Sequence, residues 1–336
     1  MRKFITLILT FILVLSLAAC GQSSENTKVE EPKNETTTNE QPTAKEPKRI
    51  PVIGLDEESK EVETYIAKDP QRIAVLDLAS LDILKSLGLA DRVVGVTTTQ
   101  IPYLQDVVTK EGVKNIGTLK SPDLEAIMEL EPDLILMGGR AGEFYKQLYQ
   151  IAPTLRLSTY KDKGVVESTK INSQKIASIF GLEEKVDELF QGFDTRIQAL
   201  KEKAKGKTAI VGIVTNGGFN VAGNDGRLSL VGREIGFENI GVESDTQTVA
   251  HGNEASFEFI VQKNPDYIFV LDRDAAIATE GAQLAKDIME NELVKSTDAY
   301  KDGNLVIVEN SAVWYTAEGG ISALDIMLKD LESTVK

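Results

Sequence analysis

The sequence of 336 residues predicts an α/β fold of two lobes with parallel sheets, joined by one long α-helix, with a ligand cleft between the lobes. Three observations support this prediction. Short apolar runs alternate with segments of helical periodicity, which is typical of parallel strands connected by helices. One helix–strand unit occurs twice in the sequence, with a fixed offset between the copies. A mainly helical region, residues 166–205, lies between the two copies.

The N-terminal lobe is expected over residues 49–165, because strand and helix patterns alternate along this part of the chain. It opens with two short runs that read as a hairpin, IPVIGL and EVETYI. The remaining elements expected are a strand over 72–77, a helix over 78–89, a strand over 92–96, a helix stopped by Pro132, and a strand over 133–137.

The helical region is expected to break at Gly181 and then to form the linking helix. Its second half carries one apolar stripe of residues three or four positions apart, namely Val186, Leu189, Phe190, Phe193, Ile197 and Leu200. A helix of about 20 residues with such a stripe spans about 30 Å. After Gly206 the C-terminal lobe, residues 206–336, is expected to resume the alternation with strands over 208–214, 266–272 and 304–309 and helices over 228–237, 256–265 and 319–333.

The repeated unit is DLEAIMELEPDLILMGGR, residues 123–140, and SFEFIVQKNPDYIFVLDR, residues 256–273, at an offset of 133 residues without a gap. The Pro-Asp pair and the isoleucines that match between the copies are common in any α/β fold. An arginine just beyond each strand is not. Ligands of open α/β sheets bind at the carboxyl ends of strands, so Arg140 and Arg273 are expected to face one shared cleft.

The first residues are typical of a targeting segment. Arg2 and Lys3 precede an apolar run that ends in LAAC, which predicts a signal peptide over residues 1–19. A short transmembrane anchor is the alternative, although the run is short for a span of about 20 residues. LAAC resembles the lipobox of bacterial lipoproteins, in which Cys20 becomes lipidated. Residues 20–48 are polar and almost free of apolar side chains, so a disordered tether of roughly 30 Å is expected.

Composition argues against several functions. The formal net charge of −15 disfavours nucleic acid as a partner. The chain has one histidine, so catalytic zinc sites rich in histidine are excluded, and no nucleophile elbow, Walker loop or dinucleotide fingerprint is found. A single cysteine allows no internal disulfide. The sequence therefore predicts a binding protein that is not an enzyme.

Further candidates for the binding site lie in the C-terminal half. Arg227 stands in NDGRLSLVG, His251 in a polar loop before the second repeat helix, and Trp314 and Tyr315 in NSAVWYTAEGG. Singly, such residues more often form surface ion pairs or pack in the core. Together with Arg140 and Arg273 they could line a site for a ligand that is anionic, aromatic and metal-bearing.

The lipobox with its tether, the paired LEAI…PDLIL and FEFI…PDYIF units, the linking helix and the WYTAEGG end resemble the helix-linked (class III) periplasmic-type binding proteins of iron-uptake ABC transporters. The chain is most similar to their catecholate-siderophore group, which includes petrobactin binders, over about residues 49–335. The resemblance implies Rossmann-like lobes. It also implies a monomeric lipoprotein that is held on the extracytoplasmic face of the cell membrane through Cys20. Such a protein would deliver ferric catecholate to a permease and its ATPase.

The resemblance also implies roles for single residues. Arg140, Arg227 and Arg273 would face the anionic ligand, with Trp314 as a further ligand contact. His251 and Tyr315 would complete the iron shell when the siderophore is only tetradentate. Glu125 and Glu258 would dock onto the permease. Ferric iron would be cargo carried within the ligand, with no intrinsic cofactor.

Two alternatives remain open at this stage. The same scaffold could bind haem, cobalamin or a ferric hydroxamate, which would have less need of three arginines. A surface-tethered sensor or adhesion module would have no need of the repeated glutamates.

Overall fold

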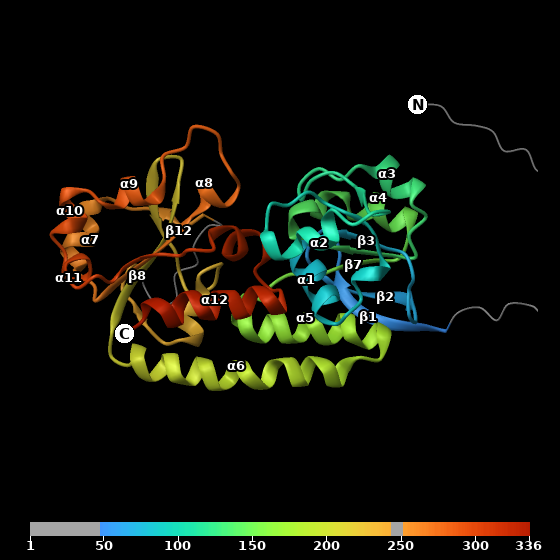
Figure 1. Ribbon diagram of the computed structural model, residues 1–336, viewed down its shortest axis with the longest axis horizontal. Coiled ribbons are helices and arrows are strands. Elements are labelled where there is room, and N and C mark those ends of the chain that lie inside the picture. Colours follow the sequence, from blue (N-terminus) through green and yellow to red (C-terminus); the bar gives the residue numbers. More distant parts are fainter. Residues whose placement is uncertain (1–47, 243–250) are drawn as a thin grey trace, which may run out of the picture. The chain divides into compact units, whose positions relative to one another are not determined.

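A computed structural model describes residues 48–242 and 251–336 of the chain (Figure 1). The predicted signal peptide, Cys20 and all but the last residue of the predicted tether lie outside the described residues. Within the described ranges, no helix is both long enough and apolar enough to cross a membrane.

The N-terminal lobe is built on a five-stranded sheet in which every neighbouring pair is parallel. The strand order is β5-β4-β3-β6-β7. The strands are β3 (Ile73–Leu76), β4 (Val93–Val96), β5 (Lys114–Asn115), β6 (Leu134–Met137) and β7 (Thr154–Arg156). The helices around them are α1 (Leu78–Ser86), α2 (Gln105–Val108), α3 (Leu124–Glu129) and α4 (Tyr145–Ile151). The expected opening hairpin is confirmed as the antiparallel pair β1 (Arg49–Leu55) and β2 (Glu61–Ala67).

The C-terminal lobe has a six-stranded sheet whose centre is parallel, as predicted. Its strands are β8 (Thr208–Thr215), β9 (Gly218–Val221), β10 (Glu238–Asn239), β11 (Asn253–Glu254), β12 (Tyr267–Asp272) and β13 (Leu305–Ile307). Two antiparallel strands, β9 and β11, were not predicted. Asn216 and Gly217 both have positive φ and form the two-residue turn from β8 to β9, a connection that an Asn-Gly pair favours.

The helices of this lobe are mostly short. They are α7 (Phe257–Lys263), α8 (Arg273–Ala276), α9 (Ala285–Met289), α10 (Glu292–Lys295), α11 (Asp298–Lys301) and α12 (Ile321–Thr334). The helix expected over 228–237 is wrong in extent, because only a π-helical turn, η4 (Leu230–Glu234), forms there. Two glycines weaken a regular helix at this place, and Gly236 ends the turn with a φ of 90°.

The connecting region consists of α5 (Gly164–Phe180) and α6 (Glu183–Ala204), and the break falls at Gly181, whose φ is 70°. The predicted apolar stripe is buried along α6, apart from the half-buried Leu189. Helix α6 lies against α5 and α12 (Figure 1). Arg196 of α6 donates to Asp325 and Glu332 of α12, which ties the two long helices together.

The repeated Pro-Asp pair has a structural role that the two lobes share. The carboxylate of Asp133, just before β6, accepts from the backbone N–H groups of Gln71 and Arg72 at the start of β3. The carboxylate of Asp266, just before β12, accepts in the same way from the N–H of Thr208 at the start of β8. In each lobe an aspartate therefore aligns two central strands, and this match between the copies needs no functional explanation.

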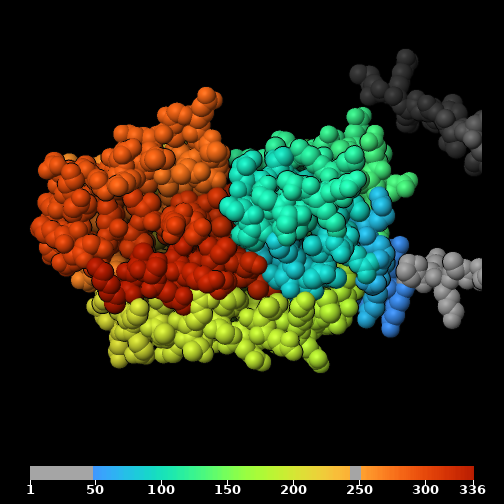
Figure 2. Space-filling view, viewed as in Figure 1, coloured from blue at the N-terminus to red at the C-terminus, as the bar shows by residue number. Residues whose placement is uncertain are grey.

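Helix α12 begins against the N-terminal lobe although it ends in the other lobe, and Figure 2 shows this C-terminal segment between the two. The buried carboxylate of Asp82 on α1 accepts from the N–H groups of Ser322 and Ala323 at 3.0 and 2.8 Å. Gly320 makes this approach possible, because a Cβ there would lie 2.2 Å from an Asp82 oxygen. Asp82 therefore caps a helix that follows it by some 240 residues.

Replacing Asp82 by alanine should lower the thermal unfolding temperature by several degrees. The change leaves the part-buried N–H of Ser322 and the buried N–H of Ala323 without acceptors, at a cost of about 1–3 kcal/mol each. Calorimetry of residues 21–336 measures the shift, with Glu111→Ala at an exposed site as the control. A variant that melts like the control would show that Asp82 does not hold the helix.

Candidate ligand-binding site

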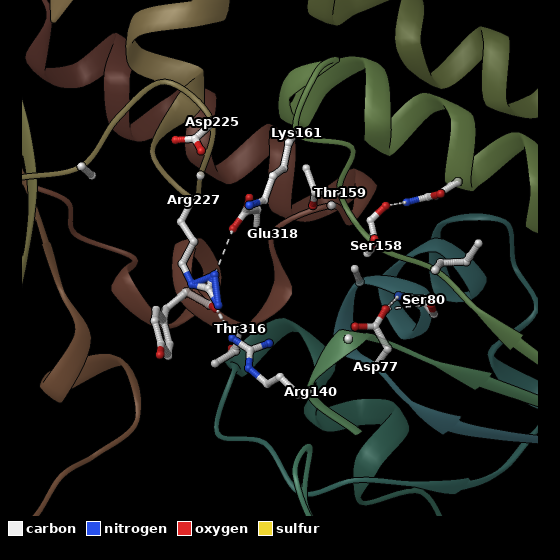
Figure 3. Close-up of a pocket in the computed structure, with 18 of the residues that line it drawn as sticks. Asp77, Ser80, Arg140, Ser158, Thr159, Lys161, Asp225, Arg227, Thr316 and Glu318 are labelled. Carbon is white, nitrogen blue, oxygen red and sulfur yellow. Dashed lines mark hydrogen bonds and ion pairs between the residues drawn. The ribbon is translucent and has the colours of Figure 1, made fainter. Parts of the chain in front are cut away.

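Two cavities, of about 410 and 460 Å³, meet at Arg140, Tyr315 and Thr316. Both lobes supply their walls. Arg140 lies in a 3₁₀ segment, η3 (Gly139–Phe144), directly beyond β6, and Arg273 begins α8 directly beyond β12. Tyr315 lies in a π-helical turn, η5 (Val313–Ala317), that leads into α12. The first cavity, drawn in Figure 3, adds Arg227 from the loop after β9.

The ring of Tyr315 lies at the centre of the three predicted arginines. The guanidinium carbons of Arg227, Arg140 and Arg273 are 4.6, 5.3 and 5.7 Å from its ring centroid. Arg140 also donates to the Tyr315 carbonyl at 2.6 Å, and Arg273 donates to its hydroxyl at 3.1 Å. The structure therefore brings together arginines that the sequence separates by up to 133 residues, and the expectation of one shared cleft holds.

Arg273 is the most firmly held of the three. Its guanidinium also donates to Thr215 at 3.1 Å and to the buried carboxylate of Asp274 at 2.8 Å. Asp274 in turn accepts from the N–H of Asn216 in the β8–β9 turn. The hairpin that was not predicted thus helps to orient a predicted site residue.

Arg140 and Arg227 have fewer partners. Burial lowers the pKa of Arg140, and the nearby Arg227 lowers it further, although an arginine stays protonated. The Nε of Arg227 is buried and has no acceptor among the described residues. The carboxylate of Glu318 lies 4.0 Å from the Nη1 of Arg227. Cations that are crowded together and incompletely paired favour the binding of an anion.

His251 and Tyr315 form a pair at the same place. The Nε2 of His251 is 3.0 Å from the Tyr315 hydroxyl. His251 is largely exposed, but partial desolvation lowers the pKa of its imidazole, and the charges of Arg273 and Arg227 lower it further, so the neutral form is favoured at pH 7. The pair offers one nitrogen and one oxygen donor. Within the described ranges, no cluster of three or more His, Cys, Asp or Glu side chains could hold a metal ion.

The expectation that Trp314 contacts ligand is not supported by its position. Its side chain is fully buried, and its indole N–H donates to Asp330 on α12 at 2.8 Å. It lines neither cavity. Trp314 anchors the segment whose next residue, Tyr315, faces the cleft.

Several residues of the first cavity were not predicted, among them Asp77, Asn172 and Glu318. Asp77 follows β3 directly, so the rule that placed Arg140 and Arg273 at strand ends could have found it. Burial raises the pKa of Asp77, and Arg140 opposes that shift. Asn172 lies inside α5 and carries no comparable signal.

Glu125 and Glu258 lie apart from both cavities. Each is exposed in the first turn of its repeat helix, after the N-caps Asp123 and Ser256. Neither has an ion pair or hydrogen bond through its carboxylate among the described residues, so both are accessible on the surface.

Comparison with known proteins agrees with this geometry. The model of the periplasmic binding protein family matches residues 73–312. The chain is 31% identical to the petrobactin-binding protein YclQ of Bacillus subtilis, over 99% of this chain and 98% of that protein. It is 28% identical to the probable siderophore-binding lipoprotein YfiY of the same species, over 99% and 98% of the two chains.

Solved structures show the same fold. The crystal structure of YclQ superposes with a TM-score of 0.78, covering 85% of this chain and 99% of that one. The catecholate-siderophore binding protein VctP of Vibrio cholerae, 28% identical, superposes with a TM-score of 0.76 over 84% and 100% of the two chains. The predicted fold class is confirmed, and the chain belongs to the periplasmic binding protein family.

Proposed function

We propose that this protein is an extracytoplasmic lipoprotein that captures ferric catecholate siderophores and delivers them to the permease of an ABC transporter. The observation that carries the proposal is the convergence of Arg140, Arg227 and Arg273 on the ring of Tyr315 in a cleft between two lobes. Relatives named as binders of petrobactin and of a catecholate siderophore support the ligand class.

The charge of such a ligand suits the cleft. Three dianionic catecholates around a trivalent iron leave three negative charges. An arginine about 4 Å away contributes roughly 4 kcal/mol of gross attraction at an effective dielectric constant of about 20, before desolvation is subtracted. Guanidinium groups also stack on aromatic rings, which catechols provide. The three arginines would contribute less to the binding of haem, cobalamin or a ferric hydroxamate with no net charge.

The His251–Tyr315 pair suits a siderophore with only two catechols. Such a ligand leaves two iron positions open, and imidazole and phenolate are nitrogen and oxygen donors that iron accepts. The donor atoms are 3.0 Å apart, so both could reach one metal ion after a small adjustment. Iron would enter and leave as part of the cargo.

Membrane anchoring through Cys20 and delivery to a permease with its ATPase complete the proposal. The name of YfiY as a lipoprotein supports the anchor. Glu125 and Glu258, one on each lobe, are exposed and have no carboxylate partner among the described residues, which suits docking onto cationic side chains of a transporter.

Changing Arg140, Arg227 and Arg273 together to glutamine should weaken binding of a ferric tris-catecholate by more than a hundredfold, because most of the attraction for the anion is lost. Residues 21–336 can be titrated as soluble protein while the fluorescence of Trp314, the only tryptophan, is followed. The matched control changes the exposed Lys110, Lys114 and Lys146 to glutamine. Equal affinity of the arginine variant and the control, or a preference for hydroxamate or haem, would refute the assigned ligand class.

Changing His251 to alanine and Tyr315 to phenylalanine should weaken binding of a ferric bis-catecholate more than that of a tris-catecholate. Only the former has iron positions for protein donors to fill. The visible charge-transfer band of the bound bis-catecholate should also shift in the variant. Equal losses for both ligands and an unchanged band would mean that neither side chain reaches iron.

A Glu125→Ala, Glu258→Ala double variant should keep its affinity for ligand but lose siderophore-dependent iron uptake in cells. The two carboxylates lie away from the cleft, so only transporter docking should suffer. Glu111→Ala, Glu292→Ala, two exposed acids elsewhere, is the control. Normal iron uptake by the Glu125→Ala, Glu258→Ala variant would contradict the docking role.

A further inference from the structure

Glu318 is an acid inside the arginine cluster. Figure 3 shows its carboxylate between Arg227 and the wall that carries Lys161, with Arg140 on the other side of Arg227. Its side chain is only 10% exposed, and one of its oxygens is 4.0 Å from the Nη1 of Arg227. A buried carboxylate in a cleft suited to anions competes with any anionic ligand for the same cations.

No hydrogen bond holds this carboxylate among the residues that the structure describes. The charged groups that face it from neighbouring elements are Arg227 in the loop after β9, Arg140 in η3 and Glu234 in η4. Lys161, Asp225 and Asp77 lie in or beside the walls of the same cavity. Glu234 makes no hydrogen bond to Glu318 among the described residues, and its Oε1 accepts from the N–H of Val166 on α5.

Two opposing effects act on the protonation of Glu318. Burial raises its pKa, and this effect outweighs the attraction of Arg227 and Arg140, which lowers it. The charge of Glu318 therefore depends on those two arginines remaining free to attract it. An anion that engages the arginines removes that attraction and adds repulsion of its own.

We propose that Glu318 is an internal counter-ion, which neutralises Arg227 and Arg140 while the cleft is empty and takes up one proton from solvent when an anionic ligand claims them. The carboxylate becomes a carboxylic acid, and the ligand replaces it as partner of the guanidinium groups. The inference rests on the proposed function only in that the ligand is an anion.

The sign of the pH dependence follows from proton uptake. A binding step that consumes a proton is favoured at low pH, so the affinity falls as the pH rises. One full proton corresponds to about a tenfold change in affinity per pH unit. A glutamine at position 318 has no charge to lose and removes this contribution.

The first arm of the test needs no siderophore. Thermal unfolding of Glu318→Gln is compared with wild type and with Glu309→Gln, which removes the same charge from an exposed site. The Glu318 variant should melt about 2–4 °C lower at low salt, because Arg227 and Arg140 then repel without a counter-ion, and added sulfate should restore most of the loss. A variant as stable as the control, or more stable, would overturn the counter-ion role.

The second arm measures binding of a ferric tris-catecholate between pH 6 and 8 by fluorescence of Trp314. Protonation of the ligand and of His251 is common to both proteins, so the difference between their slopes reports position 318. The affinity of Glu318→Gln should fall less steeply with rising pH than that of wild type, and the two slopes should differ by up to about tenfold in affinity per pH unit. Equal slopes for the two proteins would contradict proton uptake by Glu318. If wild type binds no catecholate, the proposed function fails, while the first arm still decides the counter-ion role.

Discussion

The cleft depends on one arrangement: the guanidinium groups of Arg140, Arg227 and Arg273 surround the ring of Tyr315. In a chain with a net charge of −15 they create a local positive site, and screening over about 8–10 Å keeps the distant acidic surface from cancelling it. Each guanidinium is held differently: Arg273 by Asp274, Arg140 by the Tyr315 carbonyl, and Arg227 only loosely by Glu318. Among the residues that the structure describes, Arg227 has the fewest partners of the three, so an anionic ligand would displace the least from it.

Tyr315 can serve as the centre because its segment is fixed at both ends. Upstream, Asp330 accepts from the indole of Trp314 and from the side chain of Asn310. Downstream, Asp82 of the other lobe caps α12. The ring is therefore positioned by α1 and α12 together, and the packing of α12 on α6 ties it to the linking helix. Continuous helices and shared caps oppose a large hinge movement between the lobes.

Hydrophobic periodicity and the internal repeat predicted most of this arrangement, because they depend on interactions between residues that are close in the sequence. The stripe on α6, the breaks at Pro132 and Gly181 and the arginines at two strand ends all follow from short-range rules. The choice between Trp314 and Tyr315 does not. Which of two adjacent aromatics faces the cleft is decided by Asp330, 16 residues further on. Glu318 is beyond such rules as well, because its environment consists of side chains brought together only by the tertiary fold.

The repeat also bears on how a bound ligand could be handed over. In the N-terminal lobe the N-cap of α3, Asp123, donates its N–H to the carbonyl of Ile116 just beyond β5, at the carboxyl edge of the parallel sheet. In the other lobe Ala255, just before α7, donates to Phe219 beside the β8–β9 turn, again at the carboxyl edge of β8. Each helix start, with Glu125 or Glu258, therefore lies at the edge that also carries Arg140 or Arg273. A transporter that docked on both glutamates would therefore meet, on each lobe, the sheet edge from which Arg140 or Arg273 reaches the cleft.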